Sequence, residues 1–203
     1  MKNLRAAASV FALSWALVGP SAYGAVYNVD AAHSQIGFRV KHMFAKVPGR
    51  FTKFNGTFDY DPDMKTTGNF SAEIETASIN TDNAKRDDHL RSADFFDAKK
   101  HPKITFKSTK VTPVDKNNFK VTGDLTMHGV TKPVDLDFEF LGEVKDPGGN
   151  LKAGFHATST INRKDWGITW NKTLDGGNFL VGEEVELDIL LEAENTAAKK
   201  KST

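Results

Sequence analysis

Most of this chain alternates apolar with polar residues, and few segments repeat an apolar position every three or four residues. In residues 119–127, for example, Phe119, Val121 and Leu125 are separated by lysine, threonine, glycine and aspartate residues. Such alternation is typical of β-strands that bury one face and expose the other. The pattern predicts eight strands, within residues 36–40, 54–60, 70–74, 104–110, 119–127, 134–140, 153–161 and 185–191, and a further short strand near residues 26–29.

One segment, residues 82–92, lacks this alternation. Residues that cap helices well stand at its start, in the run 81–83, and Asp87 and Arg91 lie four positions apart, where opposite charges on a helix attract. We therefore predict a short helix over residues 83–91. A helix of about two turns is too short to cover the apolar faces of eight strands.

Strands with one apolar and one charged face must bury the apolar face, so without helical cover the sheet has to pack on itself as a barrel or a sandwich. A barrel of about eight strands is just wide enough to be filled by side chains or to hold one slender ligand. Small residues at apolar-face positions allow two interpretations, an open axis or room for neighbouring Phe rings. They are Gly56, Ala72, Gly123, Ala153 and Ala157.

The first 24 residues resemble a leader rather than part of the fold. A basic start, an apolar run over residues 6–18 and a stretch of small residues follow one another, as in a secretory signal peptide. The apolar run is shorter than the roughly 18 residues that a membrane helix needs. We predict a signal peptide over residues 1–24, cleaved before Ala25 or Val26, a single β domain over residues 25–194 and a disordered tail over residues 195–203.

Charge and composition exclude several classes of function. The 203-residue chain has a formal net charge of +1, which becomes −1 when the leader takes Lys2 and Arg5 away. Neither nucleic acid nor an acidic lipid surface would attract such a chain strongly. The 15 Phe residues far outnumber the 3 Tyr and 3 Trp, which predicts an interior with few hydroxyl groups that need buried partners.

The residues that carry most enzyme and metal chemistry form no motif. Cysteine is absent, and no two of the six histidines lie closer than nine residues. No Gly-x-Ser-x-Gly turn or glycine-rich phosphate loop occurs. We therefore predict no catalytic residues, no cofactor and no metal site, although a metal site assembled from different strands stays open. The histidines are His33, His42, His89, His101, His128 and His156.

Two polar segments have both a functional and a structural interpretation. Residues 86–97 could form a lid whose Arg86 and His89 meet the polar head of a ligand, or an ion-paired helix that closes one end of the barrel. Residues 161–168 could present Arg163 to a ligand beside apolar rings, or anchor a corner between strands.

Five segments spread along the mature chain resemble the YceI-like family. They are HSQIGFRVKHM at 33–43, RDDHLRSADFFD at 86–97, HPKITFKS at 101–108, VTGDLTMHGVTKP at 121–133 and INRKDWGI at 161–168. The resemblance implies a bacterial periplasmic protein with an all-β fold, an extended eight-stranded antiparallel, lipocalin-like barrel. It also implies that a polyisoprenoid or another long apolar chain, such as that of an isoprenoid quinone, binds inside. Trp166 stands where the family often has Phe.

Our first hypothesis is therefore a periplasmic carrier that holds a long apolar chain and exchanges it with the membrane. The alternatives are a lipid-modifying enzyme that uses His and Asp groups around the short helix, and a structural β-sandwich with a filled core. Exposed strand edges would permit a homodimer. The predicted lining is Phe38, Val40, Phe58, Phe70, Ile74, Phe106, Leu125, Phe138, Phe155 and Trp166, and the predicted polar end is His33, Arg86, His89 and Arg163.

Overall fold

The computed structural model describes residues 25–61, 66–174 and 179–195. The predicted signal peptide, residues 1–24, and residues 196–203 of the predicted tail lie outside these ranges. Asn195, with which the predicted tail began, is the last residue of a strand and is buried.

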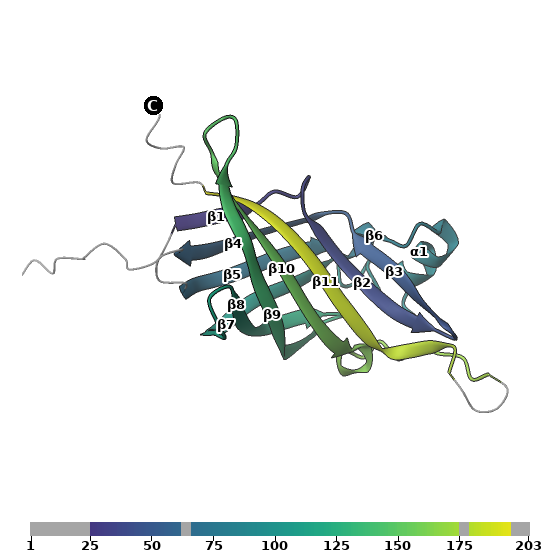
Figure 1. Cartoon of the computed structure of the whole chain (residues 1–203). Helices are drawn as coiled ribbons and strands as arrows, with labels where there is room; N and C mark the ends of the chain where they lie inside the picture. The colour runs from purple at the N-terminus through teal and green to yellow at the C-terminus, as the bar shows by residue number, and fades with distance from the viewer. Residues whose placement is uncertain (1–24, 62–65, 175–178, 196–203) are drawn as a thin grey trace, which may run out of the picture.

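The described residues form one antiparallel sheet, which curls into a barrel (Figure 1). One α-helix, α1 (Ala84–Arg91), and two short 3-10 turns, η1 (Thr76–Ser78) and η2 (Arg163–Trp166), interrupt the strands. The strands are β1 (Ala25–Val29), β2 (Gln35–His42), β3 (Ala45–Phe51), β4 (Phe54–Asp61), β5 (Thr66–Glu75), β6 (Ile79–Asn80), β7 (Lys103–Pro113), β8 (Asn118–Met127), β9 (Val130–Lys145), β10 (Leu151–Asn162) and β11 (Val181–Asn195).

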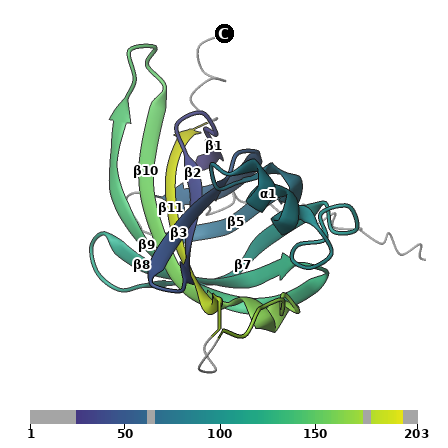
Figure 2. The same ribbon diagram turned by 90° about the vertical axis from the view of Figure 1, so that its right-hand side faces the viewer.

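The long strand β11 closes the barrel. One of its edges pairs with β10, and its other edge pairs first with β2, from Val181 to Leu190, and then with β1, from Ala193 to Asn195. The pairing of β1 with β11 completes the ring β1-β4-β5-β7-β8-β9-β10-β11 (Figure 2). The predicted eight-stranded antiparallel barrel is thus confirmed, and β2, β3 and β6 extend the sheet beyond the ring.

The strand β3 was not predicted, because Pro48 interrupts its pattern. Proline donates no backbone hydrogen bond, so within sheets it is found at edges. In this structure Pro48 faces Arg39 on β2, and on the other side of β3 only Arg50 and Phe51 pair with β6. Pro48 therefore lies where β3 has a free edge within the described part of the sheet.

The helix α1 lies at the end of the barrel away from β1 (Figure 1). Asn83 caps it, as its side chain accepts a hydrogen bond from the backbone N–H of Arg86 at 3.0 Å. The predicted pairing of Asp87 with Arg91 is wrong. Arg91 donates to Asp88 instead, and the buried Asp87 accepts from Thr81. No helix among the described residues is long and apolar enough to cross a membrane.

Aromatic rings fill the β1 end of the barrel. The ring of Tyr27 stacks on Phe58, with centroids 5.5 Å apart, and Phe58 stacks on Phe70 at 5.1 Å. Phe138 lies 5.0 Å from Phe70, and Phe155 meets Phe58 edge-on at 5.0 Å. We call these five residues, with Phe119, the aromatic floor, because they close this end of the interior.

The small residues of the apolar face serve both purposes that the sequence left open. Gly56 and Ala72 line a cavity, which leaves space along the axis. Gly123 instead makes room for an aromatic side chain, because a methyl group there would overlap the ring of Phe106. Ala153 and Ala157 are fully buried in the cluster around the aromatic floor.

The substitution Gly123→Ala should therefore destabilise the fold. The added methyl group must displace the Phe106 ring, and overpacking of this kind typically costs about 1–3 kcal/mol. Gly154→Ala is the matched control, because its methyl group would meet Leu141 Cβ at an ordinary 3.5 Å. Urea unfolding of both variants tests this, and equal stabilities would contradict the close approach at Gly123.

Candidate functional site

Two apolar cavities lie one behind the other inside the barrel. The larger has a volume of about 300 Å³ and lies beneath α1, between β2, β3 and β11. The smaller, of about 140 Å³, lies deeper, against β4, β5 and β7. Phe51, Met127, Ile161 and Leu187 line both, so these cavities are successive parts of one interior.

The aromatic floor bounds the interior at its inner end, and the larger cavity reaches the surface at the outer end. Phe58, Phe70 and Phe138 belong to the aromatic floor and also line the smaller cavity. The larger cavity is lined in part by the exposed residues Lys41 and His42 near the tip of the β2–β3 hairpin. A ligand would therefore enter at the α1 end and stop at the floor.

The two cavities differ in the charge of their lining. None of the charged residues that the structure describes lines the smaller cavity, whose polar groups are Asn55, Thr57 and Ser71. The larger cavity has basic residues and one hydroxyl group, and no carboxylate of the described residues lines it. These polar groups are Lys41, His42, Thr81, Arg86, His89 and Arg163.

Arg86 and His89 project from α1, and each has a partner nearby. Arg86 Nε donates to Thr81 Oγ1 at 2.7 Å, and one of its terminal nitrogens donates to the Thr81 carbonyl at 2.8 Å. His89 Nε2 lies 2.9 Å from Asp94 Oδ2, and the His89 ring packs edge-on against Trp170. The helix therefore contains an element of each interpretation, since it covers part of this barrel end and places two basic side chains at the larger cavity.

Arg163 is buried beneath the mouth of the larger cavity, with 4% of its surface exposed. Its Nε donates to the Gly182 carbonyl at 2.9 Å and its Nη1 to the Ile168 carbonyl at 2.7 Å. Its Nη2 has no hydrogen-bond partner among the described residues. Burial lowers the pKa of Arg163, but an arginine starts so high that its guanidinium stays charged at neutral pH.

The structure places eleven of the fourteen predicted site residues on the two cavities. Phe38, Val40, Arg86, His89 and Arg163 line the larger one. Phe58, Phe70, Ile74, Phe106, Leu125 and Phe138 line the smaller one.

The other three predicted residues lie elsewhere. Phe155 is buried in the aromatic floor. Trp166 is buried beside the interior and donates its indole N–H to the Leu125 carbonyl at 3.0 Å. His33 lies on the outer surface with 65% of its side chain exposed.

Sequence reasoning missed several lining residues for different reasons. Val185 and Leu187 belong to the alternating run of β11, so the signal that identified the other lining residues could have found them. Val47 lies in the unpredicted strand β3. Trp170 follows the η2 turn, where no periodicity indicates which way a side chain points.

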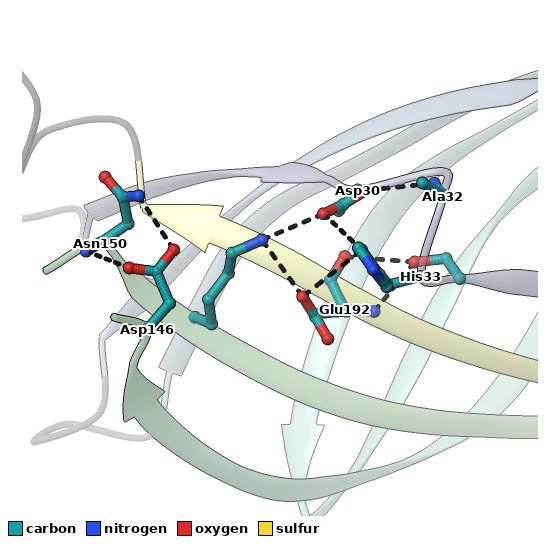
Figure 3. A network of polar contacts seen from close by, with 8 residues as sticks. Asp30, Ala32, His33, Asp146, Asn150 and Glu192 are labelled. Carbon is teal, nitrogen blue, oxygen red and sulfur yellow. Dashed lines mark hydrogen bonds and ion pairs between the residues drawn. The ribbon is translucent and has the colours of Figure 1, made fainter. Parts of the chain in front are cut away.

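His33 belongs to a polar network on the outer surface (Figure 3). Ligand atoms of Asp30, His33 and Glu192 lie within 4.8 Å of one another, a spacing that a metal ion could use. However, Lys152 Nζ lies 3.0 Å from Asp30 and 3.1 Å from Glu192. The protein's own ammonium group therefore supplies the cation between these carboxylates. The hydrogen bond from His33, followed by the one from Lys152, lowers the pKa of Asp30.

The same contact makes the stability of the β1–β2 corner depend on pH. The hydrogen bond to Asp30 raises the pKa of His33, so this pair stabilises the fold fully below the ordinary histidine pKa and loses that effect as pH rises through the raised value. Wild type should exceed His33→Ala in free energy of unfolding by more at about pH 5 than at about pH 9. Denaturant unfolding across this range measures the difference, and a constant difference would show that the charge of His33 has no part in it.

Comparisons with known proteins agree on one family. The family model described as "YceI-like domain" matches residues 27–193. A UPF0312 protein of Vibrio cholerae is 42% identical over 144 residues, which cover 70% of this chain and 76% of that protein. A UPF0312 protein of Pectobacterium carotovorum is 41% identical over 187 residues, which cover 91% of this chain and 94% of its relative.

Solved structures show the same barrel. Burkholderia cenocepacia BcnA matches with a TM-score of 0.71 at 25% identity, over 81% of this chain and 98% of that protein. The YceI protein of Campylobacter jejuni matches with a TM-score of 0.67 at 36% identity, over 82% and 96% of the two chains. A polyisoprenoid binding domain from Saccharophagus degradans has a TM-score of 0.59 at 19% identity, over 83% and 98%, which shows a shared fold.

Proposed function

Because this chain belongs to the YceI-like family, we propose that its cavities hold a polyisoprenoid or similarly long apolar chain, such as that of an isoprenoid quinone. The observation that carries this proposal is the continuous apolar interior, open at α1 and closed by the aromatic floor. The fold shared with a polyisoprenoid binding domain supports it. The predicted signal peptide supports a periplasmic site of action.

The size of the interior sets how much of a ligand it can hold. Pockets for drug-sized ligands have volumes of about 300–1,000 Å³, and the larger cavity, at about 300 Å³, lies at the low end of that range. The smaller cavity adds a narrow extension toward the floor. A slender chain would therefore enter tail first, and a long polyisoprenoid would keep only part of its length inside.

The energetics favour an exchanging carrier over a permanent store. Moving a CH₂ group from water into an apolar site gains about 0.8 kcal/mol, so several isoprene units would exceed the known limit of affinity near −20 kcal/mol. Such lipids reside in membranes, however, where their chains are already out of water. Transfer from bilayer to barrel exchanges one apolar environment for another, and the net change in free energy is small.

Exposed apolar side chains beside the mouth support exchange with a membrane. Phe44, at the tip of the β2–β3 hairpin, is 98% exposed, and its neighbour Met43 is also exposed. Phe179 is also exposed. It lies close to this tip, because the carbonyl of its neighbour Leu180 accepts a hydrogen bond from the Met43 N–H. The chain without its predicted signal peptide has a net charge of −1, which does not attract it to acidic lipids. Contact with a membrane would therefore depend on these exposed apolar side chains.

The direct test is to extract the purified protein with organic solvent and analyse the extract by mass spectrometry. We expect a long-chain lipid, or uptake of added isoprenoid quinone by the extracted protein. Repeated absence of both would contradict the proposal.

Leu187→Trp tests whether the two cavities act as one. An indole at this shared wall should block the passage between the two cavities. The affinity for geranylgeraniol should then fall about tenfold or more, and the affinity for farnesol should fall less, because the longer chain loses more buried CH₂ groups. A displacement assay with an apolar fluorescent dye measures both. Leu190→Trp is the matched control, because Leu190 is exposed on the same strand. Equal losses for the two alcohols would show that the chain does not reach the smaller cavity.

Phe44→Ser tests the contact with the membrane. Loss of one fully exposed aromatic anchor should slow transfer of a fluorescent isoprenoid analogue from phosphatidylcholine vesicles by about tenfold, without changing its affinity for the protein. Val114→Ser, which alters an exposed apolar residue between β7 and β8, is the control. An unchanged transfer rate in Phe44→Ser would exclude insertion of this tip.

One contact favours the alternative of a lipid-modifying enzyme, namely the pairing of His89 with Asp94 beside the larger cavity. No serine lines that cavity, and the Thr81 hydroxyl already donates to Asp87. Turnover of an isoprenyl ester or phosphate that is lost in a folded His89→Ala protein would establish the enzyme in place of the carrier.

A further inference from the structure

We propose that Arg163 receives the acidic head group of the ligand, so that this protein selects long apolar chains ending in a carboxylate or a phosphate over neutral chains of the same length. This inference rests on the proposed function, because it specifies the head of the molecule whose tail the barrel would hold. It gives Arg163 a binding role in addition to its contacts with two backbone carbonyls.

The first argument is the incomplete bonding of a buried charge. A guanidinium group has five N–H donors, and a buried charge is costly unless it is hydrogen-bonded and paired. Arg163 satisfies Nε and Nη1 through the carbonyls of Gly182 and Ile168, but Nη2 has no partner among the residues described here. Anchoring the η2 corner thus accounts for two of its three nitrogens. The third nitrogen is itself buried, and Arg163 lines the larger cavity, so an oxygen atom of a ligand at this wall would be the partner that Nη2 lacks.

The second argument is the missing counter-charge. Within the described chain, no carboxylate oxygen lies within 4.0 Å of the Arg163 guanidinium. Glu183, which is near enough to favour its charged form, forms an ion pair with Lys164. A neutral carbonyl of a ligand would accept a hydrogen bond from Nη2 but leave the charge of the guanidinium unpaired. A carboxylate or phosphate oxygen would accept the hydrogen bond and also pair the charge.

The surroundings of Arg163 point to the same ligand chemistry. Lys41, His42, Arg86 and His89 line the same cavity, and among the residues that the structure describes no acidic side chain does. The acids on and just after α1 are already engaged, since Asp87 accepts from Thr81, Asp88 pairs with Arg91 and Asp94 contacts His89. The smaller cavity is free of charge. The interior therefore has a polarity that fits an acidic head at the outer end and an apolar tail toward the floor.

Two matched pairs of ligands test this on the wild-type protein. Palmitate is compared with hexadecanol, and farnesyl phosphate with farnesol, each by displacement of a bound apolar dye. We expect the acidic member of at least one pair to bind about tenfold more tightly or better. The preference should persist at about 0.5 M salt, where attraction to surface lysines is screened. The pair that shows it identifies a carboxylate or a phosphate as the head group.

The Arg163→Gln variant assigns the preference to this residue. It should abolish the preference, so that the acid and its alcohol bind the variant with equal affinity. Arg39→Gln, which removes an exposed arginine paired with Asp188 on the outer face, should keep the preference. If Arg163→Gln does not fold, Arg163→Lys, which keeps the charge but has fewer donors, should show a reduced preference.

The possible failures can be told apart. Equal affinity of acid and alcohol in the wild type overturns the role of Arg163 but leaves the carrier intact. A preference that survives in folded Arg163→Gln assigns it to other basic groups and also overturns the inference. Failure of all four ligands to displace the dye contradicts the proposed function itself.

Discussion

This structure depends on closure of the sheet onto itself. Nearly every strand has an apolar face, and α1, of eight residues, covers one end of the barrel and not its walls. Strand β11 pairs with β10 on one edge and with β2 and β1 on the other, which closes the sheet into a barrel. The apolar faces of the strands are then buried against one another. The interior that results is apolar because each strand directs its alternate side chains inward.

The positions of the large aromatic rings decide which part of the interior is filled and which part is open. At the β1 end the rings of Tyr27, Phe58, Phe70 and Phe155 contact one another and leave little room. Toward α1 a second cluster of buried side chains surrounds the interior and leaves the two cavities open. A barrel filled from end to end would support only a structural role, whereas a half-filled one supports a tail-binding site with a defined depth.

The polar groups follow the same division along the axis. Within the described part of the chain, charged residues line the outer cavity and none lines the inner one, and the buried Arg163 lies on the outer cavity. The apolar side chains of the lining set how an apolar chain would be held, while the basic lining sets which end of a ligand would face the mouth. Binding and selection would thus fall to different residues of one interior.

The sequence by itself determined the strands other than β3 and β6, the short helix and the inward faces, because alternation and capping are local properties that neighbouring residues express. It also identified eleven residues of the cavity lining, since most of them lie on those inward faces. It did not indicate β3, where Pro48 hides the pattern, or the positions of Phe155, Trp166 and His33. Only the tertiary structure decided which rings fill the barrel and which leave it open, and that Arg163 is buried with a nitrogen unpaired. These properties depend on contacts between strands far apart in the chain, and no local pattern encodes such contacts.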